Sequence, residues 1–545
     1  MFTRFYQNII LKKPKSIFLI LLITLLSFGY YSKDFRLDAS SETLLIEGDP
    51  DLKYLQEISK RYGSKEFLIL TYTPNEGMVS DTSINNLLSL KYKIQSLEWV
   101  HSVITLLDVP LLNSSDVNLQ ERLKNFKTLK DEEIDRDRGF KEILNSPVFR
   151  NFVISEDGKT SGIIINIKEN NELKDITNKT KKEIDDHKDL IKKQNHQNIL
   201  QIRDVIKSYE DIGKIHLGGI PMIADDMMSF IKSDIIVFGL GVFLFIICTL
   251  WFVFRKLIWI IIPISSCFFS VTIMMGILGL IGWKVTVISS NFIALMLILT
   301  MAMNIHMSTR FLQLRENFPD MNILELITLT TNKMFWPILY TVLTTIIAFL
   351  SLIFSEIKPI IDFGWMMTFG LITSFIITFT LLPSLLNFTH ADNISIKKEQ
   401  NSKITSILGS ISLKNKNSIF SITGIVIILS ITGISKLEVE NSFINYFNKN
   451  TEIYKGMKLI DEKLGGTTPL EVIVKFPKQK NQTEDEDDWG DENEDENSEK
   501  YWFTKDKIDK INKVHNYLDS LEPVGKVLSF SSIIEVANQL NDGKP

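Results

Sequence analysis

Cysteine is scarce in this chain of 545 residues, and the little there is lies in apolar surroundings. Cys248 and Cys267 both fall inside apolar runs, which excludes a disulfide framework and a thiolate metal site. The seven histidines show no metal-ligand spacing, and the sequence carries no nucleophile triad, phosphate-binding loop or nucleotide-binding motif. We therefore expect no metal, no cofactor, no nucleic-acid partner and no enzymatic activity.

Acidic residues outnumber basic residues in the whole chain, but a single segment accounts for the difference. The formal net charge is −5, and residues 484–499 hold 11 acidic residues and no basic one, so the rest of the chain is net positive. Such a composition is typical of a solvated, disordered loop, which we place at residues 480–500. The spacing also resembles a calcium-binding loop, although Trp489 occupies a position that should hold an oxygen ligand.

Long apolar runs dominate the remaining sequence. A helix needs roughly 20 mainly apolar residues to cross the core of a bilayer, and seven runs approach or exceed that length. They are residues 17–31, 235–254, 257–281, 285–307, 336–354, 360–386 and 418–435. The pattern predicts a polytopic α-helical membrane protein.

The charges beside these runs predict their orientation. Basic residues gather in loops that all fall on one side when the spans alternate: Arg4, Lys12, Lys13, Lys15, Arg255, Lys256, Arg310, Arg315, Lys397, Lys398, Lys403, Lys414 and Lys416. The positive-inside rule places that side, with the N-terminus, in the cytoplasm, and the segments 32–234 and 436–545 outside. The first run also suits a cleaved signal peptide. The matching run at 418–435 lies in mid-chain, which favours a membrane span for both.

The chain contains an internal repeat. Residues 11–18 read LKKPKSIF and residues 413–420 read LKNKNSIF, and each segment opens an apolar run that leads into a polar region. Repeats that include the membrane path are typical of secondary transporters. The expected parts are a cytoplasmic start with the first span (1–31), an external domain (32–234), a five-span bundle (235–386), a basic cytoplasmic linker (387–417), a seventh span (418–435) and a second external domain (436–545).

Alternating strand and helix patterns predict α+β folds for both external segments. In the first we expect strands at 65–73, 100–107 and 214–217, helices at 83–100 and 171–210, and a hairpin of strands 149–155 and 160–168 around Glu156-Asp157-Gly158. The second repeats the start, with a strand at 469–476, a helix at 504–524 and a strand at 525–533. Both indicate split β-α-β layers of the ferredoxin-like kind.

Two stretches carry a family resemblance. The motifs of residues 218–311 are Gly218-Gly219 with Pro221, the Arg255-Lys256 turn, and Ile305-His306 followed by Arg310-Phe311. Those of residues 335–386 are Thr344-Thr345, Phe349-Leu350-Ser351-Leu352, Phe363-Gly364 and Leu382-Pro383. As a set they resemble the resistance-nodulation-division (RND) superfamily of permeases, in particular its MMPL-like branch of predicted exporters of hydrophobic molecules.

The resemblance implies a twelve-span protein of two six-span halves, each with a porter-like external domain after its first span. On this scheme the chain holds one six-span half, with a bundle like that of sterol-sensing domains, and the start of a second half. We therefore expect the sequence to be part of a longer protein. The small residues of the spans, such as Gly276 and Gly364, are expected to let helices approach closely, and Pro383 to permit bending.

The proton-carrying carboxylate of the family is missing. In this branch the fourth span commonly contains Gly-x-Asp-Tyr-x-Ile-His, and aligning the final Ile-His with Ile305-His306 puts the Asp on Ala302. The span offers Asn291, Asn304 and His306 instead, and only His306 titrates near neutral pH. His306 also suits a residue at the membrane interface.

Two carboxylates near the membrane remain as candidates for coupling. Asp362 lies just inside the sixth span, and Asp234 lies at the start of the second. Both also suit boundary residues, and the coupling residue could instead belong to the second half. Because ionisable groups inside a membrane are costly, those present usually have a function.

The resemblance implies a transporter in the bacterial inner membrane that exports or relocates a hydrophobic or amphipathic substrate, with lipid as one option, driven by an ion gradient. Its expected partners are membrane lipid and the substrate, and a homo-oligomer stays open. One alternative is a non-transporting, lipid-binding sensor or scaffold of the sterol-sensing type, which the missing carboxylate favours. Another is a protein-export accessory, although the long segment 32–234 argues against it.

Overall fold

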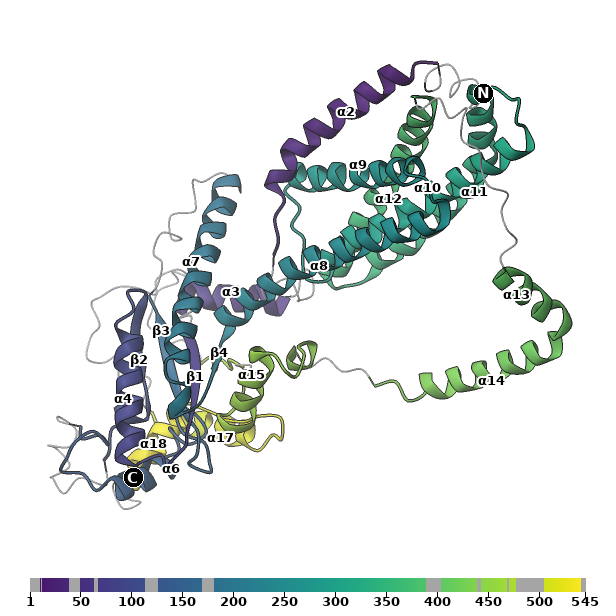
Figure 1. Cartoon of the computed structure of the whole chain (residues 1–545). Helices are drawn as coiled ribbons and strands as arrows, with labels where there is room; N and C mark the ends of the chain where they lie inside the picture. The colour runs from purple at the N-terminus through teal and green to yellow at the C-terminus, as the bar shows by residue number, and fades with distance from the viewer. Residues whose placement is uncertain are drawn as a thin grey trace. The chain divides into compact units, whose positions relative to one another are not determined.

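The computed structural model describes residues 10, 12–38, 50–62, 67–112, 126–168, 181–388, 403–438, 443–467, 470–476 and 504–540. The chain forms two compact units, which we call the membrane unit (residues 1–61 and 227–440) and the sheet unit (62–226 and 441–545). Figure 1 shows the elements of both. The acidic segment 484–499, with its predicted disorder and its resemblance to a calcium loop, lies outside the described residues.

Seven helices in the described part of the chain are long and apolar enough to cross a membrane, and each predicted span falls on one of them. They are α2 (Pro14–Tyr31), α8 (Ile220–Phe254), α9 (Ile258–Ile281), α10 (Phe292–Asn317), α11 (Ile323–Leu350), α12 (Lys358–Phe388) and α14 (Lys416–Ile434). The shorter helices of this unit are η2 (Ser32–Asp34), α3 (Pro50–Tyr62), η7 (Ser289–Asn291), η8 (Ser351–Phe354) and α13 (Lys403–Lys414). The prediction of a polytopic helical membrane protein is confirmed.

Helix α8 begins well before the apolar run that predicted it. It has 35 residues, which at about 1.5 Å per residue makes it longer than the roughly 30 Å hydrocarbon core of a bilayer. Its first residues, up to Asp226, belong to the sheet unit, and the rest belongs to the membrane unit. One continuous helix therefore joins the two units.

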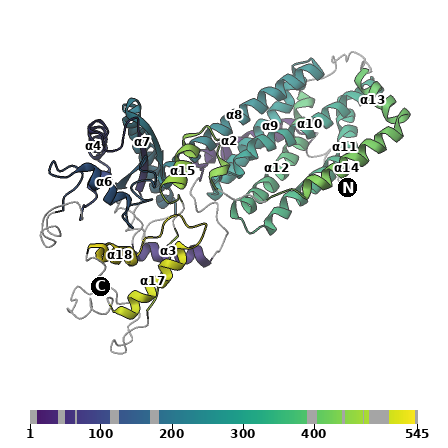
Figure 2. The ribbon, with the colours of Figure 1, turned by 90° about the horizontal axis from the view of Figure 1, so that it is seen from below.

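Small residues bring the membrane helices into backbone contact. Helices α9, α10 and α12 contact one another in the bundle and lie side by side in Figure 2. A Cβ atom added to Gly276 or Gly279 of α9 would lie 2.1 Å from a backbone carbonyl oxygen of α2 or of Tyr31 at its end. One added to Gly364 of α12 would lie 2.6 Å from the oxygen of Phe349. Because lipid tails are as apolar as the side chains, close packing of this kind holds such helices together.

The sheet unit is built on four antiparallel strands. They are β1 (Phe67–Pro74), β2 (Val100–Ile104), β3 (Ser161–Ile167) and β4 (Gly213–Gly218), in the spatial order β2-β3-β1-β4. The helices around them are α4 (Asp81–Gln95), η4 (Leu106–Asp108), α6 (Arg136–Leu144), α7 (Lys181–Lys207) and η6 (Glu210–Ile212). The order β1, α4, β2, β3, α7, β4 along the chain is that of a split β-α-β fold.

The core of the sheet unit follows the period of its elements. Leu68, Leu70 and Tyr72, alternate residues of β1, are fully buried, as expected for one covered face of a strand. Leu87, Leu90 and Ile94 of α4 and Ile199 and Ile202 of α7 belong to the same buried cluster. The predicted strands and helices of the first segment are therefore largely present, with α7 starting at Lys181 among the described residues.

The described secondary structure of the second segment consists of helices, one of which packs on the sheet. They are η10 (Phe443–Tyr446), α15 (Glu452–Lys463), α17 (Lys505–Asp519) and α18 (Phe530–Leu540). Helix α15 packs beside β4, the edge strand (Figure 1). Covering an edge in this way protects its unpaired backbone groups from pairing with another chain.

Three predicted strands are wrong. At 149–155 the chain turns back on itself, since Asn151 has a φ of 58° and its N–H bonds the Ile154 carbonyl, so only Ile154 bridges to the start of β3. The described part of 469–476 is irregular, and 525–533 is irregular up to the start of α18. Neither of the last two pairs with a strand among the described residues, and an extended segment with no partner forms no ladder.

Candidate functional site

A seam of neutral polar side chains runs between α10 and α12 in the interior of the membrane unit. Thr300, Asn304 and Ser308 follow one another at intervals of four residues, so they share one face of α10, and all three are fully buried. They face Ser374 and Thr378, one turn apart on α12 and almost as fully buried. We call these five residues the polar seam.

Hydrogen bonds join the two helices across the polar seam. Thr300 Oγ1 donates to Ser374 Oγ at 2.7 Å, and Asn304 Nδ2 donates to Thr378 Oγ1 at 3.2 Å. Asn304 Nδ2 also donates to the Thr300 backbone oxygen at 2.8 Å. Both pairs lie 74 positions apart along the chain, so the two helices keep one register along the polar seam.

Two atoms of the polar seam can form hydrogen bonds that the described residues do not supply. Asn304 Oδ1 and Ser308 Oγ are buried and find no hydrogen-bond partner among the described residues. A buried polar atom without a partner costs about 1–3 kcal/mol, and such atoms are commonly satisfied by an internal water molecule. The five side chains of the polar seam are neutral and do not titrate near neutral pH.

The other residues proposed from sequence for coupling do not join the polar seam. Asp362 is half-buried in the first turns of α12. The exposed ones are Asn291, Ala302 and His306 on or beside α10 and Asp234 on α8. Ala302 and His306 are one turn apart, on a face of α10 that is exposed in this unit, whereas Asn304 faces α12. Of the five coupling candidates, which are Asn291, Asn304, His306, Asp362 and Asp234, the structure therefore fully buries only Asn304.

The glycine pair before α8 makes the bend from β4 into that helix. Gly219 has a φ of +117°, a conformation that favours glycine, and an added Cβ would lie 2.9 Å from the Phe67 oxygen. An added Cβ on Gly218 would lie 2.5 Å from Ile460 of α15. Pro221 follows in the first turn of α8, where a missing N–H is tolerated, and its carbonyl accepts a bond from Asn195 Nδ2 at 3.0 Å.

The remaining motif residues make local contacts. Thr344 and Thr345 bond backbone oxygens of their own helix, α11, at 3.0 and 2.7 Å. Phe363 packs against Phe349 with ring centroids 5.7 Å apart, beside the close approach at Gly364. Arg310 donates to Gln313 at 3.2 Å, and Pro383 lies inside α12. These contacts are those of packing residues.

An ion-pair cluster, which sequence reasoning missed, joins α15 to the start of α8. Arg203 of α7 donates through Nη2 to Asp226 Oδ2 at 2.6 Å and through Nε to Glu452 Oε2 at 2.9 Å. Beside it, His196 Nδ1 lies 2.9 Å from Asp225 Oδ1. The signal in the sequence was two adjacent aspartates just ahead of an apolar run.

The charges of this cluster shift its pKa values. Burial works against the charge of Arg203, but Asp226 and Glu452 outweigh burial and raise the pKa of the guanidinium. Burial raises the pKa of the Glu452 carboxyl, and Arg203 opposes that shift. The guanidinium and the two carboxylates are only partly exposed to water, so each charge depends on its partner for stabilisation.

The other end of α15 is also paired. Lys463, its last residue, lies 2.9 Å from Asp157 in the turn before β3. The hydrogen bond from Lys463, with one from Ser155, lowers the pKa of Asp157 to about 2. Helix α15 thus carries an acid at its first residue and a base at its last, each bound to the first segment, and both charges suit the dipole of the helix.

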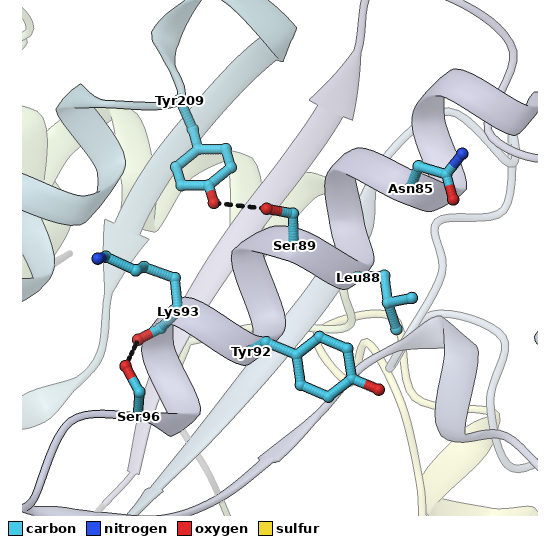
Figure 3. Close-up of a pocket in the computed structure, with 7 residues that line it drawn as sticks. All are labelled: Asn85, Leu88, Ser89, Tyr92, Lys93, Ser96 and Tyr209. Carbon is cyan, nitrogen blue, oxygen red and sulfur yellow. Dashed lines mark hydrogen bonds between the residues drawn. The ribbon is translucent and has the colours of Figure 1, made fainter.

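An open groove of about 560 Å³ lies on the sheet unit along α4. It is lined by Asn85, Leu88, Ser89, Tyr92, Lys93 and Ser96 of α4 or its end, and by Tyr209. Figure 3 shows Ser89 and Tyr209 facing each other, with their oxygens 2.7 Å apart. The residues that line the groove are polar or half-exposed side chains of the surface, so we assign it no ligand.

The described helices define a polytopic membrane protein, in which the long helix α8 follows directly on strand β4 of the sheet. The chain matches the MMPL family over residues 115–404, more than half of its length, and it belongs to that family. Members of the family are RND-type membrane transporters. A comparison with curated proteins found no match.

Proposed function

We propose that this chain is an RND-type permease that exports or relocates a hydrophobic or amphipathic molecule, with membrane lipid as the substrate class. The observation that carries the proposal is the MMPL match over 115–404, which covers all of α8 to α12 and the second half of the first sheet. We place the protein in the bacterial inner membrane with residues 32–234 and 436–545 in the periplasm as porter-like domains, because the basic loops then face the cytoplasm.

The lipid-facing surface supports this substrate class. Helix α8 exposes large apolar side chains along its membrane part, among them Phe245 and Phe252, each about three-quarters exposed. A substrate dissolved in the bilayer can reach such a helix sideways, without passing through water.

We assign coupling to the polar seam. The acceptor Asn304 Oδ1 and the hydroxyl of Ser308 are buried without partners, and a water molecule between them would satisfy both. Hydroxyl groups accept and donate, so Thr300, Ser374 and Thr378 can relay a proton to or from that water when each releases its own proton as it accepts another. Asn304 would then position the water, from a different face of α10 than that of Ala302, the position aligned with the family carboxylate.

The test replaces Asn304 by Leu in membrane vesicles energised by a proton gradient, with the hydrophobic fluorophore N-phenylnaphthylamine as the transported probe. Leucine cannot form the buried hydrogen bonds of the Asn304 amide. We expect their loss to raise the free-energy barrier of the coupled step by about 1.4 kcal/mol, which lowers gradient-driven transport on the order of tenfold. The matched control is Thr341→Val, since Thr341 is exposed and bonds only its own helix. Equal transport in Asn304→Leu and the control would remove the polar seam from coupling.

A lipid-binding sensor or scaffold is the second candidate. The observation that favours it is the lack of an ionisable group in the polar seam together with Ala302 at the carboxylate position. Such a protein binds lipid in the bundle but does not speed its transfer. Probe binding without gradient-dependent movement in the same vesicles would select this function.

A further inference from the structure

A histidine lies beneath helix α15, on the strand that this helix covers. His216 is the fourth residue of β4 and pairs with Thr71 of β1. A Cβ added to Gly456 of α15 would lie 3.8 Å from the Cβ of His216, so the helix passes directly over this position. Because His216 is half-buried, water reaches its imidazole only in part.

The charges closest to the His216 imidazole are basic. Lys214 is two residues away on β4, so the two side chains lie on the same face of the sheet, and Lys455 lies on α15. Strand β1 supplies no charge here, because its residues opposite this pair are Thr71 and Thr73. Among the described residues only the backbone oxygen of His216, not its ring, takes part in a side-chain hydrogen bond, at 3.5 Å from Thr71 Oγ1.

Burial and the neighbouring charges both oppose a positive charge on His216. Burial lowers the pKa of the imidazole, and the positive charges of Lys455 and Lys214 lower it further. An imidazole released into water regains the ordinary pKa of about 6.5. His216 therefore binds a proton more tightly when α15 is undocked. Docking is strongest above about pH 6.5 and weakens as the pH falls below that value.

The ion pairs at the two ends of α15 do not produce the same dependence. Asp157, which binds Lys463, has a pKa of about 2 and stays ionised through the neutral range. Arg203 keeps its charge throughout. Burial raises the pKa of Glu452, so protonation of Glu452 favours the docked helix and opposes the effect of His216. Among these groups His216 is the one whose protonation weakens docking.

We propose that His216 makes the docking of α15 on the sheet sensitive to pH. At neutral pH the imidazole is uncharged, and α15 covers the edge strand β4. In acid the imidazolium meets the charges of Lys214 and Lys455 under the helix, and α15 leaves β4 in a larger fraction of molecules. The contact between the two segments of the sheet unit, 62–226 and 441–545, then loosens. The proposal uses contacts within the sheet unit and does not depend on transport.

The experiment compares hydrogen exchange of the full chain in detergent micelles at pH 7.5 and at pH 5.5, after correction for the intrinsic pH dependence of amide exchange. Peptides from α15 report docking, and peptides from α4 report the rest of the sheet unit. The test variant is His216→Gln, which is uncharged at both pH values. The matched control is His101→Gln, since His101 is exposed on β2, at the other edge of the sheet.

A screened pair of partly exposed like charges changes an equilibrium by up to about fivefold. Because two lysines and burial act together, we expect corrected exchange of α15 in the wild type to be on the order of tenfold faster at pH 5.5, with α4 unchanged. His101→Gln should behave like the wild type, and His216→Gln should lose the acceleration.

Equal acceleration of α15 exchange in the wild type and in His216→Gln would overturn the proposal, as would no acceleration in the wild type. A second variant, Lys214→Gln with Lys455→Gln, replaces two exposed side chains and covers the case in which His216→Gln does not fold. It should reduce the acceleration to the part that burial causes. An undiminished acceleration in that variant would also contradict the proposal.

Discussion

The packing of α15 on β4 makes a prediction about one glycine. A Cβ added to Gly456 would lie 2.3 Å from the backbone oxygen of Leu217, which is held by the pairing of β4 with β1. In Gly456→Ala the gap must open by roughly 1 Å to reach an ordinary van der Waals separation. Forced backbone shifts of this kind cost about 1–3 kcal/mol.

The higher helix propensity of alanine offsets part of this cost. Alanine stabilises a helix interior by about 1 kcal/mol relative to glycine. Complete undocking would expose Ile453, Met457 and Ile460, which are at most 5% exposed, and would cost roughly 5–9 kcal/mol at about 1.5–3 kcal/mol each. We therefore expect α15 to shift without undocking, with a net loss of up to about 2 kcal/mol.

Hydrogen exchange of the full chain, read by mass spectrometry on peptides from α15 and β4, measures this loss. A loss of up to about 2 kcal/mol corresponds to exchange up to about 30 times faster where local opening controls the rate. The control is Gly77→Ala, since nothing lies within 4 Å of a Cβ at Gly77 in the same unit. Slower exchange of α15 in Gly456→Ala would mean that helix propensity outweighs the contact and would refute the packing argument.

Two further predictions concern the ends of α15. Because its pKa falls from 3.8 to about 2 in the folded protein, Asp157 stabilises the contact with Lys463 above about pH 4, and this contribution is lost as the pH falls toward 2. Pepsin should cleave α15 increasingly over that range in the wild type, relative to Asp157→Asn, and a constant ratio would contradict the pairing. Arg203→Met should destabilise the sheet unit by about 1–3 kcal/mol, since it leaves Asp226 and Glu452 without their cation. Adding Asp226→Asn and Glu452→Gln should restore most of the slow hydrogen exchange, and failure to do so would show that the arginine acts by packing.

The spans and the first sheet could be predicted because their signals are local. Twenty apolar residues are enough to predict a membrane helix, and the alternation of Leu68, Leu70 and Tyr72 is enough to predict a strand with one buried face. The segments at 469–476 and 525–533 carry the same local pattern, but residues 470–476 and 525–529 are irregular and residues 530–533 begin α18. A strand also needs a neighbour, which no local pattern supplies.

The candidate site shows the same limit. Asn304 could be selected because an amide inside an apolar run is conspicuous. Its partner Thr378 could not, because the register between α10 and α12 depends on how two helices pack. Arg203 and Glu452 meet across 249 positions of sequence, so their pairing is a property of the tertiary fold.

The most direct test of the transport claim uses the purified chain in proteoliposomes that contain a fluorescent phospholipid. Transfer of that lipid to acceptor vesicles is followed with and without an imposed proton gradient. The proposed permease should transfer the lipid faster when the gradient is present than when it is collapsed, and faster than protein-free vesicles do. Lipid binding with a transfer rate equal to that of protein-free vesicles, whatever the gradient, would contradict transport and favour the lipid sensor.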